Sequence, residues 1–158
     1  MTKPANALRL EHGFGIIELL IVIIIATLLM TVAYPNLARL LPAHRLEGAA
    51  RNLMADLQKV RFRAISENQC FQVTFSAGAG TYQLQKKPAS PGCIAGAYAT
   101  DGVAQAIDSA SAVTLSTTAN PVFDSRGGAQ PVTTVTLSSR TSATRLVKVD
   151  LSGRVYVQ

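Results

Sequence analysis

The chain changes abruptly from a short polar stretch to a long apolar run. Residues 14–34 contain one charged side chain, Glu18, and no proline. An α-helix rises about 1.5 Å per residue, so this run reaches about 31 Å, which matches the roughly 30 Å hydrocarbon layer of a membrane. The pattern therefore predicts a single transmembrane helix over residues 14–34.

The pattern becomes amphipathic after this run. Between positions 46 and 64, apolar side chains recur at intervals of three and four residues, and charged side chains occupy the other positions. This spacing places the apolar residues on one face of a helix. We therefore expect an amphipathic continuation of the helix over residues 35–68, with its apolar face packed on a sheet.

Segments with the strand pattern follow the helix. Residues 71–75 and 82–85 alternate apolar and polar positions around a glycine-containing loop, which is typical of a β-hairpin. Residues 88–112 are rich in small side chains, and a long flexible loop with at most a short regular piece is expected there. Further strands are expected at 113–116, 121–123, 132–137, 145–151 and 155–157. The body, residues 69–158, is therefore predicted to be β-rich, and the fold class is α+β.

Composition argues against catalysis and metal binding. The 158 residues have two histidines and two cysteines, with no spacing typical of zinc ligands. The glycine-rich string at 126–128 lies between strand-like runs, so we expect a turn there rather than a phosphate-binding loop. His44 is the only histidine after the apolar run, which leaves no nucleophile and base pair. We expect no enzyme, no metal site and no cofactor.

A specific motif marks the start of the apolar run. Residues 1–13 form a polar leader, and the run opens with the string Gly13-Phe14-Gly15-Ile16-Ile17-Glu18-Leu19-Leu20. This string resembles the processing site of type IV prepilins and of the pseudopilins of type II secretion. The resemblance implies that a prepilin peptidase cuts after Gly13, that Phe14 is then N-methylated, and that Glu18 serves in assembly. Gly15 departs from the threonine often found after the phenylalanine, and we expect processing to be unaffected.

Physical chemistry also favours a role for Glu18. A carboxylate at the centre of a membrane helix costs roughly 2.5 to 3.5 kcal/mol, and less near an end, so an intramembrane acid indicates a function and a partner. Cleavage would free the α-amino group of Phe14, and the amine of a neighbouring subunit could pair with Glu18. The alternative is a simple signal anchor with an incidental acid. The distribution of basic residues does not choose an orientation.

Later segments resemble a narrower group, the minor pseudopilin H and FimT/FimU minor pilins. The resemblance lies in residues 57–68 with 71–75, in Val122-Phe123-Asp124 with Gly127-Gly128, and in residues 151–155. It implies a pilin-like fold, in which the second half of a long N-terminal helix packs on an antiparallel β-sheet body. It also implies a minor subunit of the type II secretion pseudopilus or of a type IV pilus, and the sequence does not choose between them.

The same resemblance implies a location and partners. The leader would be cytoplasmic, residues 14–34 would cross the inner membrane once, and the body would be periplasmic. The implied partners are other pilin and pseudopilin subunits, the prepilin peptidase and N-methyltransferase, the inner membrane and, in secretion, an exoprotein cargo.

Both cysteines, Cys70 and Cys93, lie in the body. Two cysteines in an oxidising compartment most often form a disulfide, and closing a loop of about 24 residues contributes roughly 3 kcal/mol. The alternative is a pair of independent thiols, with Cys70 buried in a strand and Cys93 in the loop.

DNA binding is a second functional hypothesis. Some FimT-like minor pilins bind DNA for natural transformation through a C-terminal Gly-Arg-x-Arg segment, and this chain has Gly153-Arg154 but Tyr156 in place of the second arginine. Neighbouring strands could bring together four cations, Arg140, Arg145, Lys148 and Arg154. A second candidate patch lies on the helix and consists of Arg51, Lys59, Arg61 and Arg63. The alternative for both sets is a solvated basic surface or contact with anionic lipid.

Overall fold

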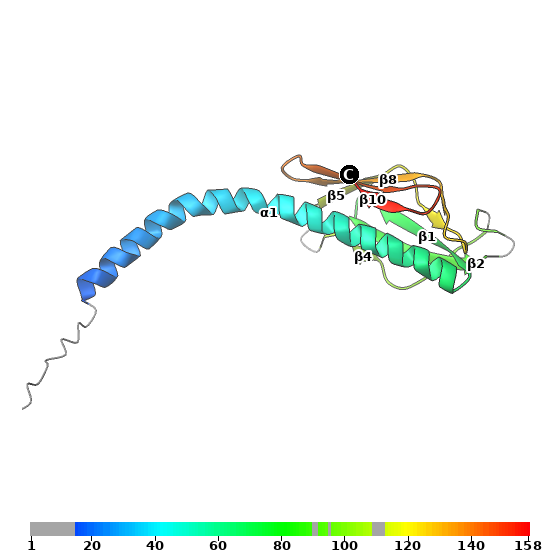
Figure 1. Cartoon of the computed structure of the whole chain (residues 1–158), viewed down its shortest axis with the longest axis horizontal. Coiled ribbons are helices and arrows are strands. Elements are labelled where there is room, and N and C mark those ends of the chain that lie inside the picture. Colours follow the sequence, from blue (N-terminus) through cyan, green and yellow to red (C-terminus); the bar gives the residue numbers. More distant parts are fainter. Residues whose placement is uncertain (1–14, 90–91, 95, 109–112) are drawn as a thin grey trace, which may run out of the picture. The chain divides into compact units, whose positions relative to one another are not determined.

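The computed structural model describes residues 15–89, 92–94, 96–108 and 113–158, and for residues 32 and 35–40 it describes the backbone alone. The described residues form one helix, α1, and ten strands, β1 to β10 (Figure 1). Two compact units are distinguished, Met1–Ala38 and Arg39–Gln158. The processing site expected at Gly13 and Phe14 lies outside the described residues.

Helix α1 comprises Ile16–Ser66, so residues 16–34 and most of the expected amphipathic continuation, 35–68, belong to one helix. The carbonyl of Gly15 accepts hydrogen bonds from the N–H groups of Glu18 and Leu19, which opens the helix. In the first unit, the described side chains of residues 15–34 are exposed. Among the described residues, no helix combines the length and the apolar character that crossing a membrane requires.

Two antiparallel sheets form the body (Figure 1). In the first sheet the order is β3 (Ala99–Thr100), β2 (Thr81–Pro88), β1 (Gln69–Ser76), β6 (Val122–Phe123) and β7 (Ala129–Gln130), and β4 (Gln105–Ala106) also pairs with β2. In the second sheet the order is β10 (Val155–Val157), β9 (Thr144–Val149), β8 (Thr133–Ser139) and β5 (Val113–Thr117).

The core lies between one face of α1 and the inner faces of both sheets. The helix contributes its apolar stripe, and the sheets contribute alternate residues of each long strand, because successive strand residues point to opposite faces. The largest fully buried side chains include Leu46, Leu53, Leu57, Phe71, Phe123 and Leu137. Burying each of these contributes about 1.5 to 3 kcal/mol relative to leaving it in water.

The predicted α+β, β-rich body is confirmed, and the structure differs from the expectation in the number of sheets, in three short added strands and in the end of one strand. The body has two sheets rather than one. The expected loop 88–112 contains β3 and β4, and β7 was not expected; each has two residues, too few to show an alternating pattern. Strand β9 ends at Val149 rather than at 151, because Asp150 begins the turn by accepting hydrogen bonds from Gly153 and Arg154. The expected hairpin of β1 and β2 and the expected turn at 126–128 are both present.

Candidate functional site

Glu18 is the one residue of the expected processing and assembly site that lies within the described chain. It occupies the first turn of α1, and its side chain is exposed. A carboxylate in the first turn interacts favourably with the positive end of the helix dipole. The position leaves the carboxylate available to a group from another molecule.

The second expected pair, Cys70 and Cys93, is a disulfide, with the two Cα atoms 5.4 Å apart. Cys70 is fully buried in β1. Cys93 belongs to the segment between β2 and β3, and the bond ties this segment to the first sheet. The alternative of two independent thiols is therefore wrong.

A second contact holds the same segment. The Lys87 ammonium nitrogen lies 5.0 Å from the centre of the Tyr98 ring, and Lys87 is 8% exposed. The Tyr98 hydroxyl donates a hydrogen bond to the Cys93 carbonyl. Burial raises the pKa of Tyr98, so this hydroxyl keeps its proton. The segment is thus held both by the covalent bond and by polar contacts.

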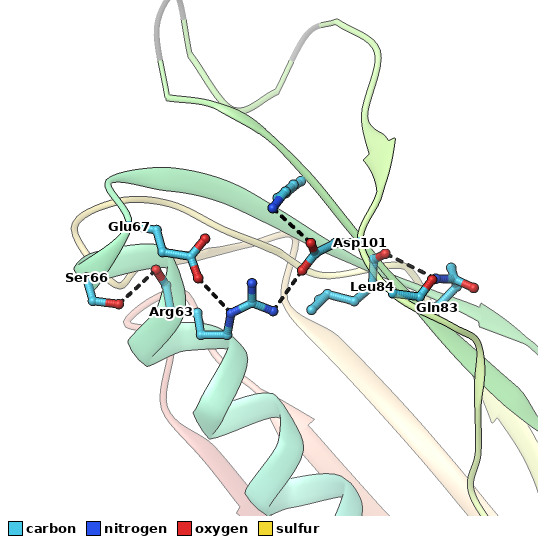
Figure 2. A network of polar contacts seen from close by, with 8 residues as sticks. Arg63, Ser66, Glu67, Gln83, Leu84 and Asp101 are labelled. Atoms are coloured by element: carbon cyan, nitrogen blue, oxygen red, sulfur yellow. Dashed lines mark hydrogen bonds and ion pairs between the residues drawn. The ribbon is translucent and has the colours of Figure 1, made fainter.

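Arg63 links the end of α1 to the first sheet (Figure 2). Its guanidinium forms ion pairs of 2.8 Å with Glu67 and with Asp101, and it lies 4.7 Å from the centre of the Phe71 ring. Lys86 of β2 also pairs with Asp101, at 2.9 Å. The hydrogen bonds from Lys86 and Arg63 lower the pKa of Asp101, although partial burial acts in the opposite direction.

Arg61 contacts two turns from different sheets. Its Nε donates to the Gly127 carbonyl at 2.8 Å, and its Nη2 donates to the Ser152 carbonyl at 3.1 Å. Gly127 lies in the turn between β6 and β7, and Ser152 lies in the turn between β9 and β10. The guanidinium therefore joins the helix to both sheets.

The second candidate basic patch is largely committed to contacts within the body. Arg61 and Arg63 make the contacts described above, and Arg51 pairs with Glu47 at 2.9 Å. Lys59 is exposed, and it has no ion pair with any other described residue. Of the four cations considered in this patch, Lys59 is therefore the one without a hydrogen bond or an ion pair to another described residue.

The other candidate set does not form one patch. Its four cations lie on opposite sides of β9 and at the ends of β8 and β10: Arg140, Arg145, Lys148 and Arg154. Arg145 is in register with Leu137, so it lies on the core-facing side of β9, and it pairs with Glu47 of α1 at 2.8 Å. Lys148 is in register with Tyr156 and lies on the opposite side of β9. Arg140 follows β8, and Arg154 precedes β10.

The carboxylate of Glu47 accepts hydrogen bonds from Arg145 and Arg51. These bonds, with the one from Arg145 the stronger influence, lower the pKa of Glu47.

Gly153 has a packing role of its own. Its φ is 73°, and a Cβ built on it would lie 1.9 Å from the Gly127 carbonyl oxygen. The glycine of the Gly153-Arg154 string is therefore explained by the approach of two turns, and it does not by itself indicate a DNA-binding segment.

Sequence reasoning also missed a polar contact of Tyr82 between the helix and the first sheet. The Tyr82 hydroxyl donates to the Asp56 carboxylate, and the side-chain amide of Gln105 lies 2.7 Å from the same hydroxyl. Burial, followed by the hydrogen bond to Asp56, raises the pKa of Tyr82. The alternation in β2 places Tyr82 on the core side, but only the fold identifies Asp56 as its partner.

It also missed a hollow of about 660 Å³ on the body surface. The hollow is lined by the outward-facing residues Gln72, Val122 and Gln130 of the first sheet, together with Ile94, Val132 and Leu151. The last three side chains are exposed although they are apolar. Exposed apolar side chains grouped in this way are typical of a surface that contacts another protein.

Two solved structures share this fold. The minor pseudopilin EpsH from the type 2 secretion system of Vibrio cholerae is similar with a TM-score of 0.58 and 12% identity, over 72% of this chain and 96% of that one. The type IV minor pilin FimU of Pseudomonas aeruginosa is similar with a TM-score of 0.56 and 17% identity, over 73% of this chain and 90% of that one. The pilin-like fold is confirmed. A search of the curated proteins finds no match.

Two family descriptions match the sequence. Residues 8–34 match the prokaryotic N-terminal methylation motif. Residues 49–153 match the type II transport protein GspH, which covers more than half of the chain. The chain therefore belongs to the GspH family of type II transport proteins, minor pseudopilins whose role is structural and not enzymatic.

Proposed function

We propose that the chain is a minor subunit of the type II secretion pseudopilus, made as a prepilin and anchored in the inner membrane. The observation that carries the proposal is the combination, on one chain, of the methylation motif at 8–34 with the GspH body at 49–153. A signal anchor would need neither the motif nor such a body. A type IV pilus is the alternative assembly.

The proposal includes maturation at the leader. Cleavage after Gly13 would make Phe14 the methylated N-terminal residue, and the anchor would be residues 14–34. The sequence supports this step through its 21-residue run with a single charged residue. The run also exposes many large apolar side chains, among them Ile16, Leu19, Ile23, Leu28 and Met30. Such a surface is unfavourable in water, and lipid or neighbouring helices would cover it.

Glu18 would act in assembly by pairing with the free amine of an adjacent subunit. Its exposed carboxylate is surrounded along the helix by isoleucine and leucine. An unpaired carboxylate in apolar surroundings is costly, and an opposite charge removes much of that cost. Lateral association would therefore be favoured when the amine is available, which is after cleavage.

Two features of the body agree with a periplasmic location and a binding role. The Cys70–Cys93 disulfide is typical of proteins in an oxidising compartment. The hollow lined by Ile94, Val132 and Leu151 offers a surface to another subunit or to an exoprotein.

No described group of three or more histidine, cysteine, aspartate or glutamate residues could hold a metal ion.

Mass spectrometry of the protein extracted from membranes tests the maturation step. We expect a chain of residues 14–158 that carries one added methyl group on Phe14. Replacing Glu18 with alanine should leave cleavage intact and reduce incorporation into pili. Replacing Glu11, which belongs to the removed leader, provides the matched control and should change neither. An intact Met1 terminus would defeat the proposal.

Secretion assays distinguish the two assemblies. In the source organism, removal of the chain should stop export of type II exoproteins and leave type IV pili and their motility intact. Loss of pili with normal export would favour the type IV pilus instead.

A further inference from the structure

The positive charge of the body is concentrated at one end. This end consists of the first turns of α1 within the body and of the β8–β9 hairpin, which the 2.8 Å ion pair of Arg145 with Glu47 joins together (Figure 1). We call it the arginine end, and its described cations are Arg45, Arg51, Arg140 and Arg145. With Glu47 as its one acid, it carries a charge of +3, which is half of the formal +6 of the chain.

The distribution of acidic residues explains this concentration. Residues 125–149 contain no aspartate or glutamate, and residues 39–55 contain Glu47 alone. Residues 56–124, which include the rest of α1 and most of the first sheet, contain five basic and five acidic side chains. The arginine end is therefore the part of the body that most strongly attracts an anion.

The guanidinium groups at this end are available to a ligand. Arg45 and Arg140 are exposed, and neither has an ion pair with another described residue. Arg51 and Arg145 share the single carboxylate of Glu47. A guanidinium presents five N–H donors in a planar fork that matches the oxygens of a phosphate group.

The chain itself holds the arginine end near a membrane when residues 14–34 span one. Tyr34 ends that run, and tyrosine is enriched at the interface between membrane and water. Arg45 follows eleven residues later, which corresponds to about 16 Å of helix and at most about 40 Å of extended chain. The headgroup layer extends about 5 to 8 Å beyond the hydrocarbon. Attraction to headgroups is therefore intramolecular in effect, and modest contacts suffice.

We propose that the arginine end binds the anionic phospholipids of the membrane in which the chain is anchored, through contacts of Arg45 and Arg140 with lipid phosphates. The contact would hold the body against the membrane before the chain enters the pseudopilus. Duplex DNA fits less well, because it gains nothing from the tether. The inference rests on the proposed function, and it names a surface and a ligand that the proposed function leaves open.

Photo-crosslinking of the full chain in lipid nanodiscs tests the proposal. A photoreactive phenylalanine analogue replaces Thr141, beside Arg140 in the turn after β8, and in the matched control it replaces Leu151, exposed in the turn at the other end of β9. The nanodiscs contain phosphatidylcholine alone or with about one third of the anionic phosphatidylglycerol. We expect the yield of lipid adduct at position 141 to be about tenfold higher in the anionic nanodiscs, and the yield at position 151 to stay low in both.

Charge variants then test the two arginines. Arg140→Gln and Arg45→Gln should each lower the yield at position 141 about fivefold, the effect of one arginine near an anionic surface. Arg140→Lys keeps the charge and should retain most of the yield. Arg126→Gln removes an exposed charge from the turn between β6 and β7 and should leave the yield unchanged. About 0.5 M salt should lower the yield of the original chain, because it screens the attraction.

Several outcomes would overturn the inference: equal yields in neutral and anionic nanodiscs, equal yields from positions 141 and 151, or equal effects of Arg126→Gln and Arg140→Gln. Duplex DNA that displaces the lipid adduct at low salt would also overturn it, because the arginine end would then prefer DNA. Recovery of the chain in nanodiscs separates this failure from that of the proposed anchor. A chain that inserts without responding to anionic lipid refutes the inference alone, and a chain that does not insert refutes both.

Discussion

Gly153 and Gly127 approach so closely that no side chain fits between them. A Cβ built on Gly153 would lie 1.9 Å from the Gly127 carbonyl oxygen and 2.9 Å from the Arg61 Nε. The two glycines belong to turns of different sheets, and Arg61 donates hydrogen bonds to the carbonyls of Gly127 and Ser152. This contact therefore determines how the end of one sheet meets the end of the other.

Gly153→Ala should destabilise the body. The substitution places a side chain at a φ of 73° and forces the backbone of the other turn to move. We expect a loss of about 3 kcal/mol, which corresponds to a fall of roughly 6 to 12 °C in Tm. Thermal unfolding of the full chain in detergent measures it. Gly78→Ala is the matched control, because a Cβ there meets nothing within 4 Å. Equal Tm values for the two variants would contradict the packing argument.

The ion pairs of Asp101 should make stability depend on acidity. Lys86 and Arg63 hold the pKa of Asp101 below its usual value of 3.8, so the folded state binds this proton less readily than the unfolded state. The stabilisation is complete well above pH 3.8, and it is lost as the pH falls through the lowered pKa.

Denaturant unfolding between pH 6 and pH 2 checks this dependence. Asp101→Asn should be less stable than the original chain at about pH 6, and the difference should shrink towards about pH 2, where both carry a neutral side chain. Addition of about 1 M salt should reduce the difference at about pH 6, because ion pairs that are partly accessible to solvent are screened. A difference that does not change with pH would show that packing, not charge, is responsible.

Loss of the disulfide should weaken the hold on the segment after β2. Reduction, or the double change of Cys70 and Cys93 to alanine, removes the covalent link between this segment and β1. We expect a cost of roughly 3 kcal/mol from loop-closure entropy. A reducing agent should lower the stability of the original chain and leave the double variant unchanged. Two reactive thiols in the denatured, unreduced protein would refute the bond.

DNA should bind weakly or not at all. Arg145 is engaged with Glu47 on the core-facing side of β9, whereas Lys148 lies on the other side, so phosphate contacts are dispersed. We expect no mobility shift of duplex DNA by the full chain at low salt, where such contacts are strongest. A shift that is abolished both by salt and by the double change of Arg140 and Arg154 to glutamine would instead support the DNA-binding alternative.

The local elements of this fold are predictable because each depends on short-range patterns. The spacing of four and seven residues between Leu46, Leu53, Leu57 and Ala64 is enough to predict both a helix and its buried face. The alternation in β1 and β2, with a glycine-containing turn between them, is enough to predict their hairpin. The pairing of β3 and β4 with β2 could not be predicted in this way. Each of these strands has two residues, which is too short to show an alternation of apolar and polar positions.

The sequence by itself determined a helix that is apolar all round in its first half and amphipathic in its second, a strand-rich body, and the processing motif with Glu18. Tertiary structure alone decided that the body has two sheets, that Arg145 turns towards Glu47 while Lys148 turns away, and that Gly153 packs on Gly127. The physical reason is the distance along the sequence over which each kind of interaction acts. Helix and strand periods are set between near neighbours along the chain, whereas ion pairs and turn contacts join residues far apart in sequence, whose meeting depends on the packing of the whole body.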